Sequence, residues 1–153
     1  MTHTPVPYHS VDHDLDRRRT LRALARGEIT RAAVCDATRE VRATAEVLGV
    51  PAGPACPVCG ADLRETQWIH GTAIGEKSGT ARSLAEIRQL LSVLRAGEEV
   101  TVHTVEVCLR CGWNHLHRED RYRGVAGRVL PESGPAGREV TLDQGPAIDG
   151  KTS

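Results

Sequence analysis

Phenylalanine is absent from this chain of 153 residues, which contains only two tryptophans, two tyrosines and one methionine. Leucine, valine and alanine must therefore supply most of the buried surface, and any hydrophobic core is small. A small core gains from a metal crosslink, because the free energy of metal binding is added to the free energy of folding. The composition thus favours a fold that is stabilised by more than its apolar side chains.

Neither an excess of one charge nor a long apolar segment is present. The 20 Lys and Arg residues balance the 20 Asp and Glu residues, so no overall basic character indicates nucleic-acid binding. The sequence also lacks a signal peptide, a lipidation motif and an apolar run long enough to cross a bilayer. We therefore expect a cytoplasmic protein without a membrane partner, in a compartment where cysteines stay reduced.

Four of the five cysteines lie in two short motifs of almost the same pattern. The motifs are Cys56-Pro57-Val58-Cys59-Gly60 and Cys108-Leu109-Arg110-Cys111-Gly112. Each Cys-x-x-Cys turn offers two thiolates, and a tetrahedral Zn²⁺ takes four thiolates at about 2.3 Å. The glycine after the second cysteine of each motif tolerates a positive φ where the chain leaves the turn. We predict one Zn²⁺ held by Cys56, Cys59, Cys108 and Cys111.

Four thiolates leave no open coordination position for water or substrate, so the predicted metal is structural. A metal-dependent hydrolase would need such a position, for instance with His70 or His115 in place of one cysteine. No nucleophile, base and orienting acid can be assembled from local spacing. We therefore expect a non-enzymatic protein without a small-molecule substrate.

The segment before the first motif predicts two helices. One begins at Val11 and is interrupted by Gly27, and the other runs from Thr30 to Gly49. We expect a helical hairpin over residues 11–49. The arginines of the first helix would suit a DNA-binding helix-turn-helix, but acidic residues on the second favour a structural or protein-docking hairpin. Cys35 is expected to be a half-buried helix residue, with a fifth ligand or a redox thiol as the alternative.

The remaining segments complete an α+β fold, in which the hairpin is followed by a four-cysteine zinc ribbon with a small antiparallel sheet. Strands are predicted over residues 63–70, 99–107 and 113–122, and a helix begins at the capping box Ser83-Leu84-Ala85-Glu86 and is inserted over residues 83–96. Alternation along 99–107 changes face after Val102, so either both faces are covered or a bulge shifts the register. The predicted organisation is a disordered lead-in (1–10), a hairpin (11–49), a linker (50–55), a ribbon (56–124) and a flexible tail (125–153).

Aromatic and basic side chains follow the second cysteine motif. Such residues can stack on bases and neutralise phosphates, or act as hot spots for a protein partner. Glu119 and Asp120 weaken the nucleic-acid interpretation, and Trp113 can instead pack against the metal site. The predicted contact surface consists of Trp113, His115, His117, Arg118, Arg121, Tyr122 and Arg123.

These features together predict a zinc-binding module that docks on nucleic acid or on a large nucleic-acid machine, such as the ribosome or RNA polymerase. The docking target is inferred by analogy with other small zinc ribbons. The alternative is a protein–protein adaptor or regulator that does not contact nucleic acid.

The second motif with its flanks also resembles a known family. The run from Val105 to Leu116, the upstream Cys-Pro-x-Cys-Gly motif and Val34-Cys35-Asp36-Ala37 are similar to a family of small, uncharacterised, zinc-ribbon-like actinobacterial proteins. The similarity covers residues 11–122. It implies an intracellular protein and supplies no activity.

Overall fold

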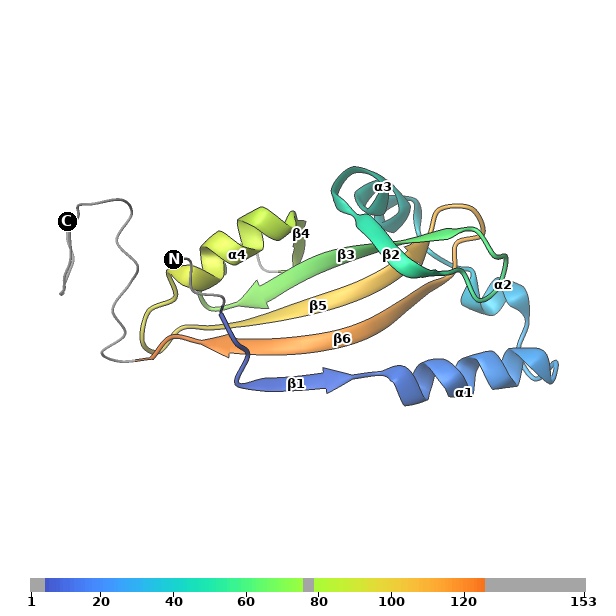
Figure 1. Ribbon diagram of the computed structural model, residues 1–153, viewed down its shortest axis with the longest axis horizontal. Coiled ribbons are helices and arrows are strands. Elements are labelled where there is room, and N and C mark those ends of the chain that lie inside the picture. Colours follow the sequence, from blue (N-terminus) through green and yellow to red (C-terminus); the bar gives the residue numbers. More distant parts are fainter. Residues whose placement is uncertain (1–4, 76–78, 126–153) are drawn as a thin grey trace.

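One antiparallel sheet dominates the computed structural model, which describes residues 5–75 and 79–125 (Figure 1). The sheet has the order β1-β6-β5-β3-β2, and β4 pairs with β3 beyond the end of β2. The long strands β3, β5 and β6 form the centre of this curled sheet. The strands are β1 (His9–Asp12), β2 (Val50–Ala55), β3 (Asp62–Gly71), β4 (Thr80–Arg82), β5 (Glu99–Cys108) and β6 (Asn114–Arg123).

Strand β5 lies between β6 and β3, and its β-branched residues suit this central position. Its pairing with β3 is continuous from Leu63↔Cys108 to Gly71↔Val100. Its pairing with β6 shifts between Thr104 and Val105, where β6 carries an extra residue. Val102 and Val107 are both buried although they point to opposite faces. The changing alternation along β5 therefore arises because both faces are covered, since the extra residue belongs to β6 and leaves the alternation of β5 unchanged.

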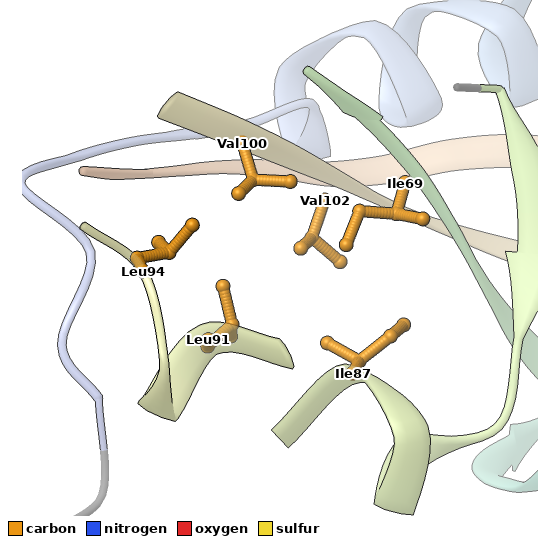
Figure 2. Packing of buried hydrophobic residues seen from close by; sticks show 6 residues of the cluster. All are labelled: Ile69, Ile87, Leu91, Leu94, Val100 and Val102. Atoms are coloured by element: carbon orange, nitrogen blue, oxygen red, sulfur yellow. The ribbon is translucent and has the colours of Figure 1, made fainter. Parts of the chain in front are cut away.

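Helix α4 (Leu84–Ser92) covers one end of the sheet and forms the larger apolar cluster. It begins at the predicted capping box, in which Ser83 Oγ accepts from the Glu86 amide at 3.2 Å and the Glu86 carboxylate accepts from the Ser83 amide at 3.0 Å. The helix is shorter than the predicted range 83–96: it ends at Ser92, Val93 is non-helical, and Ala96 forms an isolated β-bridge with Gly124. The α4 cluster consists of Ile69, Ile87, Leu91, Leu94, Val100 and Val102 (Figure 2).

The predicted helical hairpin over residues 11–49 is wrong. Residues His9–Asp12 pair with β6, so helix α1 starts only at Asp14 and ends at Ala25. The second predicted helix is two helices, α2 (Arg31–Val34) and α3 (Arg39–Leu48). Helix α1 runs along the β6 side of the sheet, whereas α3 lies over β2 and β3 (Figure 1).

The apolar spacing misled because Val34, Val41, Ala45 and Leu48 recur at helical intervals in the sequence although residues 35–38 are not helical. The break exists because residues 35–38 dock on the second cysteine motif, where the Ala37 amide donates to the Gly112 carbonyl at 3.0 Å. Thr38 then begins α3 by accepting from the Val41 amide at 3.2 Å. Tertiary contacts at this point override the local helical pattern.

The small ribbon of the predicted α+β fold is also wrong, since β3, β5 and β6 are each ten residues long and belong to a larger sheet. The stretch 50–55, predicted to be a linker, forms β2 and pairs with β3. Its prolines are tolerated because β2 lies at the edge of the sheet, with a register shift between Pro51 and Ala55.

The chain ends were predicted to lack structure. In the lead-in, the Tyr8 amide donates to the Arg121 carbonyl at 2.8 Å, and β1 begins at His9. Most of the predicted tail, residues 126–153, lies outside the described residues. Among the described helices, none has the length and apolar character needed to cross a membrane.

Candidate metal centre

The two cysteine motifs form turns with the same backbone geometry, here called the first knuckle (residues 56–60, between β2 and β3) and the second knuckle (108–112, between β5 and β6). In each, the glycine amide donates to the carbonyl of the first cysteine at 3.0 Å. Gly60 and Gly112 have φ values of 81° and 91°, as the sequence predicted. The sheet places the knuckles together because β3 and β5 pair at Leu63↔Cys108.

The four cysteine sulfurs of the knuckles all lie within 4.8 Å of one another. The Cys59 and Cys108 sulfurs are 3.5 Å apart, and the Cys56 and Cys111 sulfurs are 3.7 Å apart. A tetrahedron of thiolates about 2.3 Å from Zn²⁺ has edges of about 3.8 Å, so this donor set fits the ion. The four cysteines predicted from the sequence are thus brought together at metal-binding distance.

Backbone amides point at the sulfurs and favour their thiolate form. The Cys59 amide donates to Cys56 Sγ at 3.5 Å, and the Cys111 amide donates to Cys108 Sγ at 3.4 Å. The Trp113 amide donates to Cys111 Sγ at 3.3 Å. These contacts partly replace the water that the buried sulfurs have lost.

Burial raises the pKa of the Cys56 and Cys111 thiols, because it penalises their charged forms. Burial also raises the pKa of Cys108, but hydrogen bonds from the Cys111 amide and the Cys59 thiol outweigh it and lower this pKa to about 7. Four thiolates in such a site require a compensating cation, and a bound metal deprotonates its thiol ligands. When bound, Zn²⁺ would crosslink the two knuckles.

Trp113 belongs to the packing around the metal centre and not to a surface. Its side chain is 1% exposed and lies in a cluster with Cys56, Leu63 and Cys108. The indole Nε1 donates to the Glu106 carboxylate at 2.7 Å, and Arg17 Nε of α1 donates to the same oxygen at 2.8 Å. Of the two interpretations of Trp113, packing against the metal site is the one observed.

The other residues of the predicted contact surface differ in their burial and in their contacts. Tyr122 packs against the α4 cluster. The remaining five are distributed as follows: His115 stacks on Trp113 and contacts the His13 carbonyl at 3.2 Å, His117 lies 3.7 Å from Asp14, Arg118 donates to Asp120 at 2.8 Å, and Arg121 and Arg123 are exposed.

Cys35 lies at the metal centre, where its Sγ is 3.5 Å from Cys111 Sγ. It sits at the end of α2 with non-helical dihedral angles. Around it, the side-chain Nδ2 of Asn114 donates to the Asp36 carboxylate at 2.9 Å, and the Arg42 guanidinium donates to the Leu109 carbonyl at 3.4 Å. Sequence reasoning named the residue but placed it inside a helix; the signal was Thr38, a helix-start residue just after it.

Two curated relatives illustrate what the chain is similar to. The uncharacterized protein Rv0049 of Mycobacterium tuberculosis and the uncharacterized protein Mb0050 of Mycobacterium bovis are each 34% identical over 128 residues. These alignments cover 83% of this chain and 88% of each relative. No solved structure shows a significant match.

A protein-family model described as a family of unknown function, DUF5318, matches residues 6–133. The matched range includes every described strand and helix and all five cysteines. The resemblance to an uncharacterised actinobacterial family is therefore confirmed, and the chain belongs to the DUF5318 family.

Proposed function

We propose that this protein is a non-enzymatic binding module with one structural Zn²⁺, which docks on nucleic acid or on a nucleic-acid assembly through arginines of α1. The observation that carries the first part is the closed set of four cysteine sulfurs. Four thiolates saturate a tetrahedral ion, and this leaves no position for a reacting water. The metal would then act by holding β2, β3, β5 and β6 together at one end of the sheet.

The docking surface is proposed on one side of α1, where the arginines are exposed and two of them lie outside every described ion pair. Arg18, Arg22 and Arg26 are all exposed and follow one another at intervals of four residues, which places them on one side of the helix. Among the described residues, no ion pair involves Arg18 or Arg22. Exposed guanidinium groups such as those of Arg18 and Arg22 are suited to phosphate contacts.

A binding titration with fluorescently labelled single-stranded RNA at several salt concentrations tests this proposal. We expect affinity to fall steeply between 50 and 200 mM salt, and the double variant Arg18→Ala/Arg22→Ala to reduce the slope of log K against log salt by about 2. The matched control is Arg121→Ala/Arg123→Ala, which removes two exposed arginines of the originally predicted surface.

The controls separate the possible outcomes. If the Arg121 and Arg123 variant is the one that loses binding, the docking surface lies on β6 and not on α1. If the wild-type protein does not bind RNA or DNA even at low salt, the nucleic-acid proposal fails and the adaptor alternative is favoured. Affinity purification with and without nuclease would then identify the protein partner.

A further inference from the structure

Five sulfur atoms meet at the metal centre, although a tetrahedral ion takes only four. Cys35 Sγ donates to Cys111 Sγ at 3.5 Å, a separation as short as that between Cys59 and Cys108 within the four-cysteine cluster. Cys35 and Cys111 are both half-buried, whereas Cys56 and Cys108 are buried. The fifth sulfur therefore stands next to a more accessible member of the cluster.

The position of Cys35 is asymmetric between two otherwise equivalent knuckles. Cys59 and Cys111 occupy the same place in their knuckles, but the described hydrogen bonds join the Cys35 sulfur only to Cys111. Residues 35–38 lie outside helices and strands, so Cys35 is not held by a continuing helix. They are nevertheless fixed against the second knuckle, since the Cys35 carbonyl would lie 3.0 Å from a Cβ placed on Gly112.

We propose that Cys35 is a reserve ligand, which can replace Cys111 on the metal. In the exchange, the bond between Zn²⁺ and the Cys111 sulfur breaks and a bond to the Cys35 sulfur forms. The proton on the Cys35 sulfur passes to Cys111 along the existing hydrogen bond, so the number of thiolates on the metal and the net charge do not change. This inference rests on the zinc site of the proposed function.

The consequence is that losing Cys111 costs less than losing Cys59. We expect Cys111→Ser to bind Co²⁺ or Zn²⁺ with four thiolates, as the wild type does. Cys59→Ser is the matched control and should bind with three thiolates and at least about tenfold lower affinity, like the double variant Cys35→Ser/Cys111→Ser. The thiolate-to-Co²⁺ absorption counts the bound sulfurs, native mass spectrometry gives the stoichiometry, and competition with a chromogenic chelator gives the affinity.

Alkylation of the metal-loaded protein provides an independent measurement. In the wild type, the one thiol that is not a ligand should be modified, and peptide mapping should identify it as Cys35. In Cys111→Ser no cysteine should be modified, because Cys35 is then bound to the metal. Cys111→Ala, which has no hydroxyl that could reach the metal, should behave in the same way.

Three results would overturn the proposal. They are equal loss of affinity in Cys111→Ser and Cys59→Ser, unchanged alkylation of Cys35 in Cys111→Ser, and failure of both Cys111 variants to fold with metal. If instead the wild type itself binds no metal, or binds it with fewer than four thiolates, the zinc site of the proposed function is wrong. The wild-type measurement therefore distinguishes the two failures.

Discussion

At the scale of single residues, Glu106 is the buried carboxylate that connects the metal centre to α1. Its side chain is 7% exposed and one of its oxygens accepts from both Trp113 and Arg17. A buried charge of this kind is tolerated only while its partners remain in place. No local pattern in the sequence pairs these three residues, because Arg17 and Glu106 are 89 positions apart.

Replacing Arg17 with Ala should destabilise the protein by about 3 kcal/mol, since Glu106 would keep only its contact with Trp113. Arg18→Ala is the control, because Arg18 is an exposed neighbour and its loss should cost less than about 0.5 kcal/mol. Urea denaturation of the metal-loaded variants measures both values. Equal stability of the two variants would show that the ion pair with Glu106 contributes nothing.

The carboxylate of Glu119 is shared by two histidines whose pKa values shift in opposite directions. His13 Nε2 lies 2.9 Å and His103 Nε2 lies 3.5 Å from its oxygens. The hydrogen bond to Glu119 raises the pKa of His13 above 6.5. Burial, together with the nearby His70, lowers the pKa of His103 below 6.5. Contact with the same carboxylate thus raises the pKa of only one of the two histidines.

An NMR titration of the imidazole resonances should find the His13 pKa above that of His103. Glu119→Gln should lower the pKa of His13, because it removes the carboxylate whose hydrogen bond raises this pKa. Because the pKa of His13 is raised on folding, its contribution to the free energy of unfolding is fully present below pH 6.5 and is lost as the pH rises through the folded-state pKa. Because the pKa of His103 is lowered on folding, its contribution is present above pH 6.5 and is lost as the pH falls through the folded-state pKa. His13→Asn should therefore be more destabilising at pH 5.5 than at pH 8. The opposite order of the two pKa values would contradict this assignment.

At the scale of elements, the knuckles differ in what surrounds their glycines. Gly60 and Gly112 both have positive φ, but nothing lies within 4 Å of a Cβ placed on Gly60. A Cβ on Gly112 would strike the Arg42 side chain and lie 3.0 Å from the Cys35 carbonyl. The second knuckle is therefore a docking surface for residues 35–42 as well as half of the four-cysteine cluster.

Gly60→Ala should cost about 1–2 kcal/mol, which is the cost of a left-handed conformation for a residue with a Cβ. Gly112→Ala should cost this amount and at least about 1 kcal/mol more, because the backbone at Cys35 must move away. Thermal denaturation of the metal-loaded variants measures the difference. If both variants lose the same stability, residues 35–42 are not held tightly against the second knuckle.

Elements could be predicted where the sequence carries a repeating pattern and not where pairing alone creates them. The strands over 63–70, 99–107 and 113–122 and the start of α4 were predicted within a few residues. Strand β1 is exposed along its length and β2 contains two prolines, so neither carries an alternating apolar signal. The four clustered cysteines followed from their spacing, whereas the contacts of Cys35 and Glu106 depend on how distant segments meet.

At the scale of the whole molecule, the two ends of the sheet are stabilised by different means. The α4 cluster lies at one end of β3 and β5, and the cysteine cluster with Leu63 and Trp113 lies at the other. Val100 and Cys108 are eight residues apart on β5, which corresponds to about 27 Å. Between them the buried positions include Thr66 and Thr104, which contribute little apolar surface. The α4 cluster therefore contributes little to the stability of the part of the sheet around the cysteine cluster.

Removal of the metal should accordingly affect the two ends unequally. With a chelator under reducing conditions, amide hydrogen exchange should accelerate by more than about 100-fold in residues 35–38 and in both knuckles, since the binding free energy of a structural zinc is far larger than the corresponding 2.7 kcal/mol. Exchange around Ile69 and Val102 should accelerate much less than in the knuckles, because apolar packing against α4 persists. Cys59→Ser without chelator, which keeps three of the four thiolates, should accelerate exchange in the same residues but by a smaller factor. Uniform acceleration along β3 and β5 would instead mean that the α4 cluster is too small to stay folded alone, and that the metal stabilises the entire sheet.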